Sequence, residues 1–132
     1  MSGSAVAWMH DARENVQMAE LALQANLFNP CLHNCQQAVE KALKAARVHC
    51  GLTMKRVHGI RKLNRDLLTR GVNLHLTDEE CGMLDSIYVA SKYPADSVLP
   101  DSPPDAAIAG KCLELARRTV RAAAAVIGEL DS

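Results

Sequence analysis

Long stretches of this sequence repeat apolar residues at the spacing of an α-helix and contain nothing that would interrupt one. Residues 5–25 hold no Gly or Pro, and a step of about 100° per residue gathers one side: Trp8, Ala12, Val16, Ala19 and Leu23. The polar residues lie elsewhere, except Asn15, which falls within the apolar sector and needs a hydrogen-bond partner there. This pattern predicts an amphipathic helix.

The composition favours packed helices over a sheet. Apolar residues make up 48% of the chain but aromatic residues only 3%, so much of the apolar share is Ala, Leu and Val. A chain of 132 residues suits one compact core. We therefore expect a single domain that spans residues 1–132.

A second helix is expected from Pro30 to the stop at Gly51, with Asn29 as its N-cap. Helical spacing assigns its apolar face: Cys31, Leu32, Cys35, Ala38, Val39, Ala42, Leu43 and Ala46. It assigns to the polar face His33, Gln36, Gln37, Glu40, Lys44 and Arg47, with Lys41 towards one edge. Glu40 and Lys44 are four residues apart, which favours an ion pair.

Three more helices complete the expected fold. A shorter one covers residues 57–69. Thr77 and Glu80 form a capping box for the next, which must end before Pro94. Ser102 is expected to cap the last helix, with Asp105 in its first turn. The predicted fold class is all-α, an up-and-down bundle of four long helices plus one shorter helix.

The cysteines do not indicate a metal site. Cys31 and Cys35 share a helix face, whereas His33 points to the other side, so one helix cannot bring all three to one ion. Five cysteines without regular spacing, and no N-terminal signal segment, indicate reduced thiols in a cytoplasmic protein. No apolar run approaches the roughly 18 residues that a membrane span needs.

No catalytic signature emerges from the sequence. It has no Glu-x-x-His pair for a di-iron site, no glycine-rich phosphate loop and no marked nucleophile, so no cofactor is expected. Basic side chains concentrate in residues 55–70 and acidic ones in residues 71–105. That asymmetry fits either an anion-facing surface or a solvated helix that pairs with an acidic neighbour.

Four segments, in order, resemble the HEPN family of small helical bundles. In chain order they are the opening helix with Trp8, Ala12, Asn15, Val16 and Ala19, residues 36–45 (QQAVEKALKA), the segment His58-x-Ile60-x-x-Leu63, and Ser91-Lys92-Tyr93-Pro94. The chain departs from the family pattern at two positions, with Asn15 in place of Asp and Lys92 in place of Arg. A contact between Asn15 and Lys41 would therefore be neutral on one side.

The resemblance implies a binding module. Related proteins are often encoded beside a minimal nucleotidyltransferase, as a toxin–antitoxin-like pair, and form homodimers. On this interpretation a nucleotide, RNA or the nucleotidyltransferase partner would contact six residues: Asn15, Gln37, Lys41, Lys44, Lys92 and Tyr93. Lysines supply charge for phosphate, and Tyr93 could stack on a base.

Two alternatives stay open. Ribonuclease members of the superfamily carry Arg-x(4–6)-His late in the bundle, and Arg70 and His75 match this spacing. They flank Gly71-Val72-Asn73 in a connection, so we interpret the match as coincidence and predict no catalytic residues. The other alternative is a non-catalytic dimeric scaffold.

Overall fold

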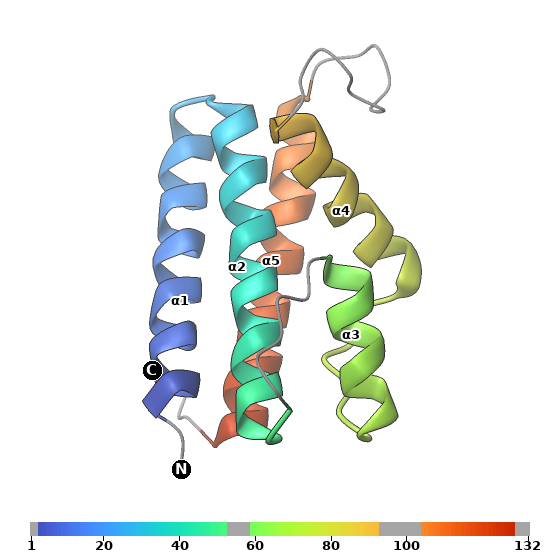
Figure 1. Ribbon diagram of the computed structural model, residues 1–132. Coiled ribbons are helices and arrows are strands. Elements are labelled where there is room, and N and C mark those ends of the chain that lie inside the picture. The colour runs from blue at the N-terminus through green and yellow to red at the C-terminus, as the bar shows by residue number, and fades with distance from the viewer. Residues whose placement is uncertain (1–2, 53–58, 93–103, 129–132) are drawn as a thin grey trace.

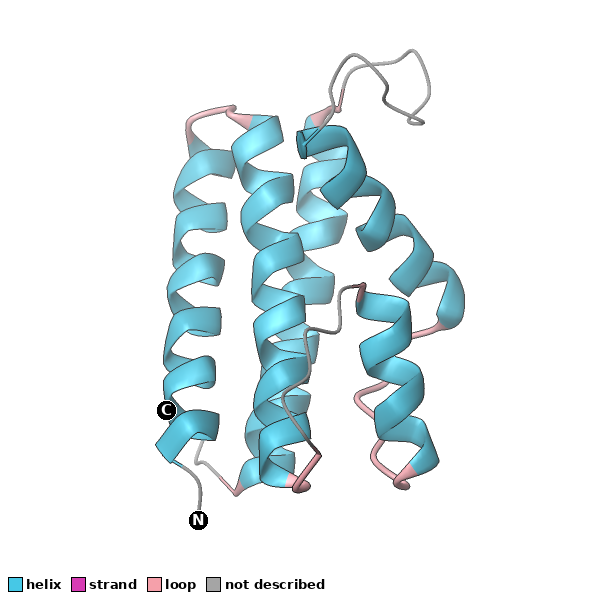
Figure 2. Cartoon of the chain, in the orientation of Figure 1, coloured by secondary structure: helices cyan, strands magenta, loops and turns pink. Residues whose placement is uncertain are grey.

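The computed structural model describes residues 3–52, 59–92 and 104–128, and the side chains within 5–52, 59–87 and 104–128. Its elements are α1 (Gly3–Gln24), α2 (Phe28–His49), α3 (Ile60–Thr69), α4 (Asp78–Lys92) and α5 (Ala106–Ile127), drawn in Figure 1. Figure 2 shows that helices make up most of the described chain. The predicted all-α bundle is confirmed. None of the described helices has the length and apolar character to cross a membrane.

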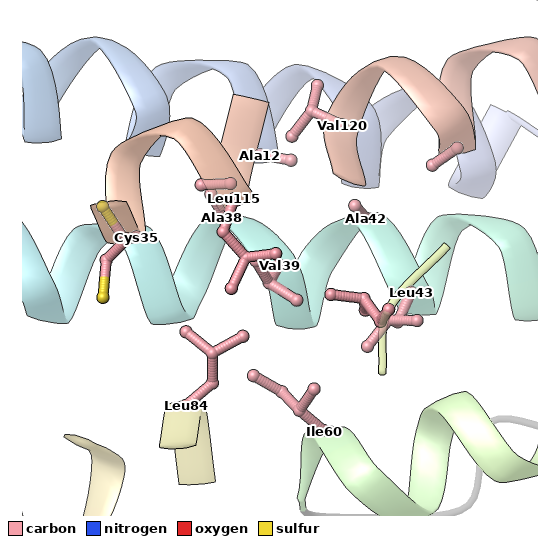
Figure 3. Close-up of a cluster of buried hydrophobic side chains, with 14 of the residues drawn as sticks. Ala12, Cys35, Ala38, Val39, Ala42, Leu43, Ile60, Leu84, Leu115 and Val120 are labelled. Atoms are coloured by element: carbon pink, nitrogen blue, oxygen red, sulfur yellow. The ribbon is translucent and has the colours of Figure 1, made fainter. Parts of the chain in front are cut away.

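Helix α2 is the centre of the bundle, because it packs against each of the other four helices. In Figure 3, Ala38 and Ala42 lie on the side of α2 that meets α1 and α5, near Ala12 and Val120. The opposite side carries Val39 and Leu43, which point towards Ile60 of α3 and Leu84 of α4. The small side chains let α1 and α5 approach closely, whereas the larger ones fill the space before α3 and α4.

The turn between α1 and α2 corrects one expectation, since α2 begins at Phe28 and Asn29 is not its cap. Asn26 adopts a positive φ of 60°, its N–H bonds to Leu23 O, and the N–H of Leu27 bonds to Ala22 O. This is the Schellman arrangement, which closes a helix C-terminus. Leu27 therefore closes α1 and also stands at the N-cap position of α2, where its apolar side chain makes no capping hydrogen bond.

Two other helix starts also differ from expectation. Helix α5 begins at Ala106, and its cap is Asp105, whose Oδ1 accepts the Ile108 N–H at 2.9 Å. Ser102 lies outside the described residues. The expected helix over residues 57–69 begins at Ile60, because Gly59 has a φ of 101° that no helix allows. The capping box of Thr77 and Glu80 is confirmed by reciprocal bonds of 2.9 and 3.0 Å.

The N-terminus of α3 is capped from another helix. Asp85 of α4 accepts the Ile60 N–H at 2.7 Å and the Arg61 N–H at 3.2 Å. Gly59 stands at the N-cap position and has no side chain to offer. Asp85 thus satisfies two backbone donors that α3 cannot satisfy itself.

Two residues assigned to the polar face of α2 are buried instead. Gln36 is 1% exposed and Arg47 is 5% exposed. Arg47 reaches α3, where its Nη1 lies 2.8 Å from Asp66 Oδ2, and Lys62 Nζ bonds to Asp66 Oδ1 at 2.9 Å. The prediction was wrong because α3 and α4 cover a side of α2 that periodicity alone left to solvent.

Asp85→Ala is expected to lower the free energy of unfolding by about 2 kcal/mol, because two N–H groups at the start of α3 lose their acceptor. Urea unfolding measures the change. Glu79→Ala, which removes an exposed carboxylate from the same helix, is the control and should change stability by less than about 0.5 kcal/mol. Equal losses for both variants would contradict the trans-cap.

Asp66 should make stability depend on pH. The hydrogen bond from Lys62 is the main cause that lowers the pKa of Asp66 below its usual 3.8, although burial opposes it. A lowered folded-state pKa stabilises the fold above the unfolded value, and this contribution is lost as the pH falls through the lowered pKa. In the Asp66→Asn variant, the free energy of unfolding should therefore depend less on pH below about pH 5. Parallel profiles for variant and wild type would refute this assignment.

Candidate functional site

A polar stripe runs along the side of α2 that borders α1. It consists of Asn34, Gln37, Lys41 and Lys44, spaced by three, four and three residues, and all four side chains are half-buried. This spacing places them on one helix face. The stripe includes three of the residues that the sequence singled out.

A chain of hydrogen bonds links the stripe to α1. Lys41 Nζ donates to Asn15 Oδ1 at 2.8 Å, and Asn15 Nδ2 donates to Asn34 Oδ1 at 2.9 Å. Asn34 Nδ2 in turn donates to the Pro30 carbonyl at 2.9 Å. Asn15 therefore has the partner that its position demanded, and it joins two residues of α2. Because the acceptor is an amide, the contact orients Lys41 without neutralising its charge.

Lys44 has different surroundings. Its Nζ lies 3.3 Å from Glu40 Oε2 and 5.2 Å from the centroid of the Trp8 ring. The expected ion pair at four-residue spacing is present. The carboxylate and the ring face both offset the ammonium charge, so Lys44 is a weaker site for an anion than Lys41.

The structure gives less information on the other three predicted residues, which are Gln37, Lys92 and Tyr93. Gln37 Nε2 donates to the buried Gln36 Oε1 at 2.7 Å, so one end of Gln37 is held inward. Lys92 is the last residue of α4, and its side chain is not among those described. Tyr93 lies outside the described residues. The contribution of all six predicted residues to binding stays a prediction.

A groove of about 500 Å³ opens beside Asn15 and Lys41, on the outer side of α1. Its other lining residues all belong to α1: Asp11, Glu14, Gln17, Met18 and Leu21. Sequence reasoning missed this groove, since it considered only the apolar sector of this helix and the polar residues outside that sector. The signal was present in Met18 and Leu21, two large apolar residues outside the core pattern.

Arg70 and His75 both lie in the connection between α3 and α4, and both are exposed. His75 has a positive φ of 65°, and its carbonyl accepts from Arg118 Nη2 at 3.3 Å. The same Nη2 lies 2.9 Å from each carboxylate oxygen of Glu80. Arg118 thus fastens this connection to α5.

The contact with Arg118 helps to lower the pKa of the Glu80 carboxyl. Burial acts to raise the pKa of Glu80, but the Thr77 N–H and the Arg118 guanidinium bond to the carboxylate and bring the pKa below its ordinary value. Glu80 therefore stays ionised and keeps Arg118 engaged at neutral pH.

The chain is similar to known proteins in sequence pattern and in fold. The family model of the HEPN domain matches residues 5–126, so the chain belongs to the HEPN family. A search of curated proteins finds no match. Among solved structures, the chain is similar to TT1696 from Thermus thermophilus, with a TM-score of 0.78 and 24% sequence identity. That match covers 95% of this chain and 99% of TT1696, and it shows a shared fold.

Asn15→Ala should lower the free energy of unfolding by about 1 kcal/mol, because Lys41 and Asn34 both lose a partner at a half-buried position. Thermal or urea unfolding measures the loss. Gln17→Ala, on the exposed side of the same helix, is the matched control. The hydrogen-bond chain contributes nothing to stability if the two variants unfold alike.

Proposed function

We propose that this HEPN protein is a nucleotide-binding module that acts with a nucleotidyltransferase-family protein. The observation that carries the proposal is the state of Lys41: its ammonium is held in place by a neutral amide oxygen at 2.8 Å, at the edge of a groove. An oriented cation whose charge is not neutralised favours a phosphate group. Asn15 in place of the family's Asp supports this proposal, since an Asp would form an ion pair with Lys41.

The rest of the proposed site follows from the resemblance and from proximity. Gln37 and Lys44 flank Lys41 on the same face of α2 and would contact the sugar or a second phosphate. Lys92 and Tyr93 would complete the site with a further charge and a stacking ring. No catalytic step is proposed, and the bound nucleotide or RNA end would be recognised rather than cleaved.

The biological setting belongs to the same proposal. The chain would form a homodimer and serve as one half of a toxin–antitoxin-like pair with its nucleotidyltransferase partner. A cytoplasmic location fits the cysteines, because all five are free thiols.

Calorimetric titration with ATP, GTP and a short RNA, at two salt concentrations, tests the proposal. Lys41→Ala is expected to weaken binding about tenfold, because a charge-assisted contact to phosphate is lost. Asn15→Asp should weaken it as well, since the new carboxylate neutralises Lys41 while leaving it in place. Binding should also weaken at the higher salt concentration.

Lys111→Ala removes an exposed lysine of α5 and should leave the affinity unchanged. Equal weakening by Lys111→Ala would indicate a nonspecific charge effect and not a site at Lys41. No heat with any of the three ligands would refute the nucleotide module and leave the dimeric scaffold as the better description.

A further inference from the structure

The outer face of α1 carries a second regular pattern, separate from the one that packs the bundle. Asp11, Glu14, Met18 and Leu21 follow one another at intervals of three, four and three residues, and all four are exposed. This is the spacing of a coiled-coil seam, in which residues of one helix meet a second helix that lies alongside. These four residues, which line the groove described above, are called here the α1 seam.

Met18 and Leu21 form the apolar half of the α1 seam, and neither is buried in the core. Met18 is 54% exposed and Leu21 is 60% exposed. The core side of α1 is supplied by other residues: Ala5, Met9, Ala12, Ala19 and Ala22. Two neighbouring large apolar side chains that the described core leaves exposed are suited to contact with another molecule.

The other half of the α1 seam is acidic. The contacts of Asp11 and Glu14 are with His10, whose Nδ1 lies 3.7 and 3.9 Å from their oxygens. Within the described parts of the chain, neither carboxylate has a Lys or Arg partner. Lys41 is the cation among the lining residues, and its Nζ is held by Asn15. A helix that covers the acidic half of this groove should therefore be basic opposite Asp11 and Glu14.

A second copy of the same helix does not meet this requirement. A parallel pairing of two α1 seams would bring Asp11 and Glu14 opposite their own equivalents, where like charges repel. An antiparallel pairing with full overlap would place both carboxylates against Met18 and Leu21, which strips them of water without a partner. The α1 seam is therefore not self-complementary, and pairing with the α1 seam of a second copy is disfavoured.

We propose that the α1 seam is the docking site for a basic amphipathic helix of a partner protein. Leu- or Met-type residues of that helix pack on Met18 and Leu21, and Lys or Arg residues two turns away face Asp11 and Glu14. The inference rests on the proposed function in one respect, namely that the chain acts with a protein partner. It locates where that partner binds and states the chemistry of its contact.

Two synthetic three-heptad helical peptides test the proposal. One carries leucines along one half of its seam and lysines along the other, and its twin carries glutamates in place of the lysines. Fluorescence anisotropy of the labelled peptides against the full chain should show binding of the lysine peptide alone. Leu21→Lys should weaken that binding at least about tenfold. Glu14→Lys should also weaken it and should raise the affinity for the glutamate peptide.

Leu68→Lys, at an exposed leucine of α3 outside the groove, is the matched control and should leave both affinities unchanged. Circular dichroism verifies that each variant folds. Equal binding of the two peptides, or lysine-peptide binding that Leu21→Lys does not reduce, would overturn the proposal. Light scattering adds a further test, because a wild-type dimer that Leu21→Lys converts to monomer would show that a second copy covers the groove.

The nucleotide titration separates this inference from the proposed function. Suppose that Lys41→Ala abolishes nucleotide binding while the α1 seam variants bind the peptides as the wild type does. The docking site is then refuted, and the nucleotide module is supported. If the lysine peptide binds as expected and no nucleotide binds, the docking site is supported and the nucleotide role is refuted.

Discussion

Close approach of α1 and α5 to α2 is the constraint on which the rest of the molecule depends. Fully buried alanines lie where these helices meet, among them Ala12, Ala38 and Ala42 (Figure 3). An alanine adds almost no side chain to keep two helix backbones apart. Only this short separation lets the small amide of Asn15 reach two residues of α2 at 2.8 and 2.9 Å. The polar stripe is therefore a product of the packing as well as of the residues in it.

The two lysines of the stripe show how packing separates residues that a sequence treats alike. Lys41 and Lys44 lie three positions apart on one face, and periodicity gives no reason to rank them. The structure places Lys44 between Glu40 and the Trp8 ring, whereas Lys41 bonds to the neutral oxygen of Asn15. Because a carboxylate and an aromatic ring offset the charge of Lys44, Lys41 is the better site for an anion.

Local features were predictable and features that join distant segments were not. The capping box of Thr77 and Glu80 spans three residues, so the sequence revealed it directly, as it did most of the buried face of α2. Asn29 was misassigned because the turn that closes α1 lets α2 begin at Phe28, so that Leu27 stands at the N-cap position. Helical periodicity does not predict how separate helices pack together. It therefore could not predict the burial of Arg47, the groove on α1 or the capping role of Asp85. The binding roles assigned through the family resemblance stay predictions.

The cap that Asp85 supplies also bears on how the molecule opens. The amides of Ile60 and Arg61 are held by a residue about 25 positions later in the chain, so the first turn of α3 loses its acceptor whenever α4 moves away. Arg61 and Arg65 strengthen the coupling through Asp78 at the start of α4. We therefore expect α3 and α4 to open together. Amide hydrogens at the start of α3 should then exchange with solvent when α4 moves away from them.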